Sequence, residues 1–365
     1  MMYRPTKALI NLPALANNLK LAKEMAPQSK VLAVIKANGY GHGIERVAQQ
    51  LSAADAFGVA SIEEAMLLRQ KGFLHRILLL EGLFSDAEIP IIVQNRLDLV
   101  IHSEYQLKWL LNSHIEVPLT VWIKVDTGMH RLGFDVQQLQ SIISQLENSP
   151  HNFVIHIMSH FASADEHNSD GQLFTEKQLK IFNKATKPYD YPKSLANSAG
   201  VIHYPESHFQ WIRPGIFLYG AGIYNEQSNS GYIERQQAVM QLESEIIAIK
   251  TVQEGEYVGY GNTWQADRKS KIGVVAIGYG DGYPWHAKNG TPVLINGQKM
   301  PLVGRVSMDM ITVDLTDALD SVAIGDKVIL WGADLSVDEV AQFCGTIGYE
   351  LLCNVTQRVP MIEIQ

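Results

Sequence analysis

Cysteine is scarce in this sequence of 365 residues, which contains only Cys344 and Cys353. Two cysteines are too few for a disulfide framework, and they form no CxxC motif or Cys/His cluster with the spacing of zinc ligands. The sequence therefore predicts two buried thiols in a reducing compartment and no bound metal.

Long apolar runs and a surplus of positive charge are also missing. No stretch of about 18 apolar residues occurs, which disfavours a transmembrane helix. Residues 1–15 lack the long apolar region of an export signal. The formal net charge of −8 disfavours sequence-independent binding of nucleic acid, because such binding needs an excess of Lys and Arg. We therefore expect a cytoplasmic protein with neither a membrane nor a nucleic-acid partner.

Hydrophobic residues make up 46% of the chain, enough for a large core, and the length suits two domains. In the first two-thirds, short β-branched runs alternate with amphipathic segments. The predicted strands are residues 31–35, 56–60, 77–80, 97–101, 119–125, 153–158, 194–196 and 212–219. The predicted helices are residues 62–71, 104–111, 136–146 and 172–185.

Eight strands with crossover segments favour a (β/α)8 barrel of the TIM type. A doubly wound open sheet is the alternative, which the absence of GxGxxG in the first βα turn weakens. Residues 201–210 are short for a crossover helix.

The pattern changes after residue 224, where a polar, linker-like segment covers residues 225–237. Short alternating runs then predict an all-β domain with a short helix at residues 337–343. Its predicted strands are residues 242–249, 272–277, 292–295, 310–314 and 327–331. Residues 8–11 form a strand that could pair with this domain. We therefore expect a barrel over residues 10–231 and a β-rich domain of residues 1–9 plus 232–365.

Lys36 ends the apolar segment VLAVIK and opens the Gly-rich turn ANGYGHG. Catalytic groups of such barrels lie at the carboxyl ends of the strands. A partly desolvated lysine has a lowered pKa and can form a Schiff base with an aldehyde. The turn is not a Walker A loop, because GxxxxGK[ST] is absent. By itself, a lysine in this position is more often a solvated residue.

The segment VLAVIKANGYGHG resembles the part of alanine racemases that carries the pyridoxal-phosphate lysine. Further blocks are similar to the family in order and approximate spacing over nearly the whole chain. They are WIKVDTGMHRLGF (122–134), SHFASADE (159–166), ANSAG (196–200), RPGIFLYG (213–220), VGYGNTW (258–264), IGYGDGYP (277–284) and GRVSMDM (304–310). The resemblance implies a barrel followed by a β domain, pyridoxal 5′-phosphate as cofactor, and interconversion of L-alanine and D-alanine that supplies D-alanine for peptidoglycan.

Racemisation needs a proton removed on one face of Cα and delivered on the other, so it needs two bases. The resemblance assigns Lys36 to the D-alanine face and Tyr260 to the L-alanine face. A free tyrosine has a pKa of about 10, and the resemblance places His160 and Arg213 in the network that tunes it. Arg213 would also meet the pyridine nitrogen, which stays unprotonated because arginine does not readily donate a proton.

The remaining roles also come from the resemblance. The other residues that it assigns to the cofactor are Tyr40, Asn197, Ser198, Gly215, Ile216 and Tyr349. Arg131 would bind the substrate carboxylate as a bidentate fork. Lys124 matches a lysine that is carbamylated in many relatives and that positions this arginine.

The β domain would contribute substrate-binding residues, namely Met308, Asp309 and Tyr279. In the family, Tyr260, Tyr279 and Met308 reach the lysine from the partner subunit. The resemblance therefore implies a homodimer with shared active sites.

Two positions depart from the family pattern. Ser307 stands where many relatives have cysteine, and His130 stands where others have glycine; both predict tuning of the pocket. A racemase of broader specificity and a pyridoxal-phosphate decarboxylase remain alternatives. A non-catalytic carrier of the cofactor is a third, although VGYGNTW and GRVSMDM argue against it.

Overall fold

Eight parallel strands close into a barrel in a computed structural model that describes residues 4–166, 168–222, 231 and 234–364. Strand pairing runs β5-β4-β3-β2-β10-β9-β8-β6, and a β5–β6 pairing closes the ring. The strands are β2 (Lys30–Val34), β3 (Ala56–Val59), β4 (Arg76–Leu79), β5 (Asp98–Ile101), β6 (Leu119–Asp126), β8 (Phe153–Met158), β9 (Lys193–Ser194) and β10 (Trp211–Ile212). The predicted barrel is therefore confirmed, and the open doubly wound sheet is excluded.

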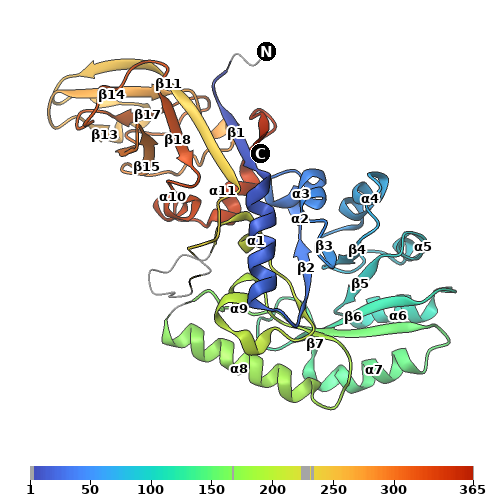
Figure 1. The fold of residues 1–365 in the computed structure, drawn as a ribbon. Helices are drawn as coiled ribbons and strands as arrows, with labels where there is room; N and C mark the ends of the chain where they lie inside the picture. The colour runs from blue at the N-terminus through green and yellow to red at the C-terminus, as the bar shows by residue number, and fades with distance from the viewer. Residues whose placement is uncertain (1–3, 167, 223–230, 232–233, 365) are drawn as a thin grey trace.

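Helices surround this barrel (Figure 1). They are α1 (Leu12–Met25), α3 (Ile44–Gln50), α4 (Ile62–Gln70), α5 (Ile89–Gln94), α6 (Glu104–Asn112), α7 (Leu139–Glu147), α8 (Ser169–Thr186) and α9 (Ser198–His203). Helix α1 begins after Asn11, whose side chain accepts a hydrogen bond from the Ala14 N–H at 3.1 Å. Such a cap satisfies a backbone donor that the first turn leaves unpaired.

The last barrel unit differs from the sequence prediction. The strand predicted for residues 212–219 is wrong, because β10 ends at Ile212 and a 3₁₀ helix, η4 (Ile216–Tyr219), follows. Pro214 lacks the N–H that a ladder needs, and Gly215 adopts φ −116° and ψ −94°, outside the strand region. The short crossover contains α9 and a 3₁₀ turn, η3 (Pro205–Ser207).

The second lobe is built on a mixed β-sheet in the order β16-β15-β18-β11-β1-β19, with β14 pairing β11 and β17. Its strands are β1 (Lys7–Asn11), β11 (Met240–Val252), β14 (Ser270–Val275), β15 (Pro292–Ile295), β16 (Gln298–Pro301), β17 (Ile311–Asp314), β18 (Lys327–Trp331) and β19 (Met361–Ile364). A two-stranded ribbon of β12 (Tyr257–Val258) and β13 (Trp264–Gln265) lies beside it. As expected, residues 8–11 pair with this domain, antiparallel to β11.

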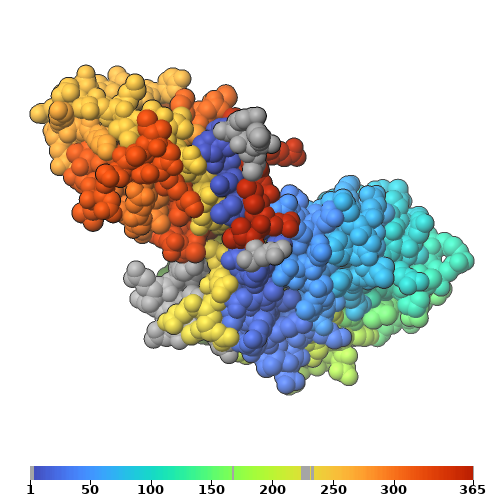
Figure 2. Space-filling model, turned by 45° about the horizontal axis from the view of Figure 1, so that its top comes forward, coloured from blue at the N-terminus to red at the C-terminus, as the bar shows by residue number. Residues whose placement is uncertain are grey.

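Two helices, α10 (Val337–Cys344) and α11 (Gly348–Asn354), complete the β lobe. The helix predicted at residues 337–343 is confirmed by α10, whereas α11 was not predicted. Of the predicted linker, residues 225–230, 232 and 233 lie outside the described residues, so the proposed domain boundary there stays a prediction. Helix α11 and β1 lie where the two lobes meet (Figures 1 and 2).

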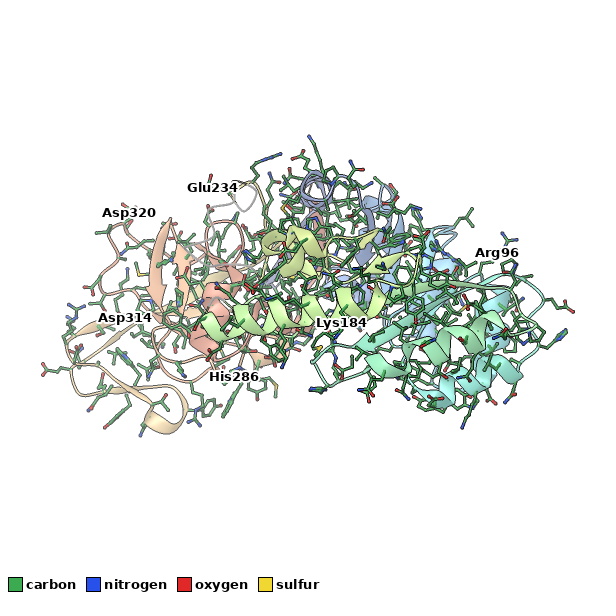
Figure 3. The ribbon with its side chains drawn as sticks, turned by 90° about the horizontal axis from the view of Figure 1, so that it is seen from below. Arg96, Lys184, Glu234, His286, Asp314 and Asp320 are labelled. Atoms are coloured by element: carbon green, nitrogen blue, oxygen red, sulfur yellow. The ribbon has the colours of Figure 1, made fainter. Side chains whose placement is uncertain are left out.

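The two lobes give the molecule an elongated shape. Figure 3 places Arg96 toward the barrel end and Asp314 and Asp320 at the β-domain end, with Lys184 of α8 between them. The residues that the family resemblance assigns to the catalytic site are divided between the two lobes.

Candidate functional site

Lys36 follows the carboxyl end of β2 and is half-buried. The turn that it opens is left-handed, because Ala37, Asn38, Gly39 and Tyr40 all have φ between 52° and 62°. Such a conformation costs about 1–2 kcal/mol per non-glycine residue, so surrounding contacts must hold it. Consecutive residues in this state cluster at functional sites.

Side chains around the turn supply those contacts. Glu64 accepts a hydrogen bond from the Ala37 N–H at 2.7 Å and another from the Ala60 N–H at 2.8 Å. His42 Nδ1 donates to the carbonyl oxygens of Tyr40 at 2.9 Å and Gly39 at 3.1 Å. His42 is fully buried, and burial lowers its pKa to about 4. The ring is therefore neutral and acts as a fixed donor.

A cluster of cationic and imidazole groups lies at the same end of the barrel. Burial, together with the charges of Arg131, Arg213 and Lys36, lowers the pKa of Lys124 to about 8. Burial and these same charges, together with Lys124, hold the pKa of His160 well below its ordinary value. Lys36, Lys124, Arg131, His160 and Arg213 thus lie in one cluster, and the charge of its lysines and arginines favours an anionic ligand.

Arg213 is buried at the centre of this cluster, with 4% of its surface exposed. Its guanidinium donates to the Ser159 carbonyl at 2.7 Å, to the Ser194 hydroxyl at 2.5 Å and to His160 Nδ1 at 3.3 Å. Because Nδ1 accepts, the proton of the neutral His160 ring lies on Nε2. Burial lowers the pKa of Arg213 to about 10, which leaves it charged at neutral pH.

Beside this cluster, the predicted phosphate-binding residues come from η4, α9, α11 and the turn after Lys36. We call this group the cradle; its residues are Tyr40, Ser198, Gly215, Ile216 and Tyr349. Ser198 Oγ accepts hydrogen bonds from the N–H groups of Gly215 at 2.9 Å and Phe217 at 3.2 Å. A Cβ atom at Gly215 would lie 2.5 Å from the Tyr40 hydroxyl. The Tyr40 and Tyr349 rings lie 6.1 Å apart. The Tyr40 hydroxyl can therefore approach the backbone of residue 215 this closely only because that residue is glycine.

Asn197 borders the cradle but has a structural contact of its own. Its side chain accepts a hydrogen bond from the Gly200 N–H at 2.9 Å and caps α9. This cap fixes the start of the helix that carries Ser198.

The β-domain candidates lie apart from the barrel cluster within one chain. Tyr260, Met308 and Tyr279 are 71%, 52% and 41% exposed. Among the described residues, no hydrogen bond or ring contact joins these side chains to Lys36 or Arg131. One chain therefore does not assemble the full set that the sequence suggests.

Asp309 is held by an ion-pair network rather than left free. Its carboxylate pairs with Arg358 at 2.6 Å, and Arg358 also contacts buried Asp281 at 3.4 Å. Asp281 pairs in turn with Arg4. Because Asp281 ends the 3₁₀ turn that carries Tyr279, this network holds the Tyr279 and Met308–Asp309 turns in one arrangement.

Comparisons with known proteins cover almost the whole chain. Residues 10–222 match the model of the alanine racemase N-terminal domain, and residues 239–363 match that of the alanine racemase C-terminal domain. The alanine racemase of Vibrio vulnificus (strain CMCP6) is 50% identical over 358 residues, covering 97% of this chain and 98% of the relative. That of Vibrio cholerae serotype O1 is 49% identical, covering 97% of each.

Solved structures agree with these relatives. The biosynthetic alanine racemase of Pseudomonas aeruginosa superposes with a TM-score of 0.94 at 46% identity, covering 99% of this chain and 100% of that one. The alanine racemase of Acinetobacter baumannii gives a TM-score of 0.89 at 37% identity, with the same coverage.

The chain belongs to the alanine racemase family. The predicted family, enzyme class (an isomerase) and fold are therefore confirmed.

In this member of the alanine racemase family, several residues that shape the site were not identified from the sequence. Glu64, Asp281 and Arg358 act through contacts between segments far apart in the chain. No local motif marks them, so only the fold reveals them. Cys353, one of the two thiols expected to be buried, is exposed, whereas Cys344 is buried. That part of the prediction is wrong, because Cys353 lies in the last turn of α11, where it and Asn354 are exposed.

Within residues 4–166, 168–222, 231 and 234–364, no group of three or more His, Cys, Asp or Glu side chains is placed to hold a metal ion. In the same part of the chain, no helix has both the length and the apolar character to cross a membrane.

Proposed function

We propose that this chain interconverts L-alanine and D-alanine with pyridoxal 5′-phosphate bound through Lys36. The observation that carries the proposal is the cationic cluster around Lys36, which lies beside the cradle at Ser198 and Gly215. Such a site suits a phosphorylated cofactor and a carboxylate substrate together. The names of the relatives support alanine as that substrate.

The residues present fit the cofactor. Gly215 leaves open the space that a Cβ atom would fill against the Tyr40 hydroxyl. Amide and hydroxyl donors at the start of short helical segments are the groups that bind phosphate in this type of barrel. The phosphate would be held by Tyr40, Ser198, Gly215, Ile216 and Tyr349, next to the Asn197 cap.

Bound pyridoxal phosphate supplies an electron sink that makes the Cα–H bond of an attached amino acid acidic. Lys36 would hold the cofactor aldehyde covalently and then move the proton on one face of Cα. Arg213 would donate a hydrogen bond to the pyridine nitrogen without giving up its proton. It would thereby limit how far negative charge spreads and favour return of the proton to Cα.

Tyr260 would move the proton on the opposite face. Its exposure in one chain, with Tyr279 and Met308 on the same β domain, supports a homodimer in which the partner copy completes each site. A two-fold arrangement gives both copies the same contact. Met308, Asp309 and Tyr279 of the second copy would then border the substrate.

Arg131 would bind the substrate carboxylate, and Lys124 would orient Arg131. Because the pKa of Lys124 is lowered to about 8, a fraction of its side chains carries a neutral amine at neutral pH. The neutral amine is the form that reacts with carbon dioxide. Carbamylation would turn one cation of a crowded cluster into an anion, which supports the role that the sequence resemblance gave to Lys124. The product D-alanine would serve peptidoglycan synthesis, and the cytoplasm is the compartment that we propose.

The reaction is tested by incubating the protein, loaded with pyridoxal phosphate, with L-alanine in deuterated water. We expect D-alanine to form with deuterium at Cα, and Lys36→Ala to form none. Cofactor binding without isomer or deuterium would contradict the racemase and favour a carrier. Loss of carbon dioxide from the substrate would favour a decarboxylase, and equal rates with L-serine would favour a broader specificity.

A further inference from the structure

Asp338 lies on α10 of the β domain, yet its carboxylate contacts the barrel. One oxygen accepts a hydrogen bond from the Gly222 N–H at 2.8 Å. The Gly348 N–H also donates to this carboxylate, and a Cβ atom at Gly348 would lie only 2.3 Å from it. One side chain therefore ties two backbone segments that are 126 residues apart in sequence.

Both segments carry walls of the proposed phosphate cradle. Gly222 packs between Ile216 and Tyr349, because a Cβ atom there would lie 2.7 Å from the first and 3.1 Å from the second. Gly348 directly precedes Tyr349 at the start of α11. The spacing of these two amides thus sets the spacing of Ile216 and Tyr349.

Side-chain packing alone does not fix this spacing. A cavity of about 190 Å³ lies at the junction, bordered by Gly222, Asp338, Gly348 and Tyr349 among others. An element beside such a space can shift unless polar contacts hold it, and hydrogen bonds to a charged group are the stronger kind of polar contact.

The carboxylate has no cationic partner among the described residues. Burial raises its pKa, and only the amides of Gly222 and Gly348 oppose that shift. A partly buried carboxylate without a counter-charge carries a desolvation cost. Its two amide bonds are the contacts that offset this cost, which points to a positioning role.

We propose that Asp338 is a positioning residue for the cofactor phosphate, because it holds the Gly222 and Tyr349 segments at the separation that the phosphate requires. The inference rests on the proposed function. It adds a second β-domain residue, beside Tyr349, to the cofactor site of its own chain, in addition to the proposed contribution of this domain to the partner's site.

The test compares Asp338→Asn with Glu339→Gln in the full-length protein. Glu339 is the next residue of α10, and its carboxylate pairs with Lys299 at 2.6 Å, away from the cradle. Dissociation constants of the apo proteins are measured for pyridoxal 5′-phosphate and for pyridoxal, which lacks the phosphate. Amide hydrogen exchange of peptides covering Gly222 and Gly348 is measured without cofactor, and Asp338→Glu tests rescue.

We expect Asp338→Asn to weaken binding of pyridoxal phosphate about tenfold or more and to change binding of pyridoxal by less than about twofold. Exchange at both glycine peptides should speed up, and Glu339→Gln should match the wild type. Equal weakening of both ligands, or unchanged exchange and affinity, would overturn the role of Asp338. If the wild type bound neither ligand, the proposed cofactor itself would fail, and accelerated exchange alone would leave Asp338 as a tie between lobes without a role toward phosphate. Should Asp338→Asn not fold, Asp338→Ser takes its place, with the same two ligands deciding.

Discussion

At the scale of single residues, burial decides how the groups of the barrel mouth behave. Lys124, His160 and Arg213 are crowded together, and desolvation is the largest cause of the lowered pKa of each. His160 is neutral, while Arg213 keeps its charge at neutral pH. The site therefore holds positive charge, and the carboxylate of Glu81 offsets only part of the shift that burial and the neighbouring cations impose on the pKa of Lys124.

Substitution of Tyr260 tests its assignment to one face of Cα. Tyr260→Phe should slow deuterium exchange from L-alanine by about a hundredfold or more, and exchange from D-alanine far less, because Lys36 still serves that face. Proton NMR of the two isomers in deuterated water measures both rates. Tyr257→Phe is the matched control, since Tyr257 is an exposed tyrosine three residues earlier. Equal losses from the two isomers would argue against the assignment.

His156 predicts how stability depends on pH. It lies inside the barrel, 4% exposed, with its ring stacked 4.5 Å from Trp122. Burial and the charge of Arg76 lower its pKa from 6.5 to about 4. Between pH 6.5 and about pH 4, the ring is therefore protonated in the unfolded state and neutral in the folded state. The stability that the neutral ring contributes is present above about pH 6.5 and is lost as pH falls toward 4, by about 2–3 kcal/mol.

His156→Phe keeps the stacked ring and removes the titration. Denaturant unfolding from pH 4 to 8 should show the variant gaining stability relative to the wild type as the pH falls, with a constant difference above pH 7. His114→Gln, at a histidine whose side chain is 86% exposed, should run parallel to the wild type. A pH-independent difference for His156→Phe would refute the buried-neutral assignment.

At the scale of elements, the sequence predicted long segments well and short ones poorly. Periodicity located β6 and α8, because many residues contribute to the pattern. It failed for η4 and α11, which are too short to show a period. The position of Lys36 after a strand could be predicted, but the left-handed turn at Ala37 and Asn38 could not. Those residues adopt it only because distant groups, such as Glu64, hold the turn.

Gly215, at the start of η4, lets the cradle be tested by adding a single methyl group. Gly215→Ala would place a Cβ atom 2.5 Å from the Tyr40 hydroxyl. We expect affinity for pyridoxal phosphate to fall about tenfold or more, with an unfolding free energy lower by about 1–3 kcal/mol. Absorbance titration and denaturant unfolding measure these, and Gly231→Ala, where a Cβ atom would meet nothing within 4 Å, is the control. Unchanged affinity for pyridoxal phosphate would contradict the proposal that the cradle binds its phosphate.

At the scale of the whole molecule, the candidate site residues are divided between the two lobes. Within one chain the two sets of side chains do not contact each other. The barrel carries Lys36 and Arg131, and the β domain carries exposed Tyr260 and Met308. The sequence resemblance implied this division, although composition and periodicity gave no sign of it. In the proposed homodimer a second copy of the chain would complete each site, because a two-fold operation that brings one β domain to a barrel mouth also does the reverse.

Subunit mixing tests this arrangement directly. Lys36→Ala and Tyr260→Phe should each be inactive as racemases. In a mixed dimer, one site receives both substitutions and the other receives none. Random association makes half of the dimers mixed, so co-expressed variants should recover about a quarter of the wild-type activity per subunit. Racemase assays on the co-purified mixture measure the recovery.

The control mixes Lys36→Ala with a chain that carries both substitutions. Every site in that mixture lacks the lysine, so no activity should return, although the dimers and their expression are otherwise the same. If Lys36 and Tyr260 of one chain served the same site, the first mixture would contain no intact site and would stay as inactive as the second. Recovery in the first mixture alone would therefore require that Tyr260 act on the partner's Lys36.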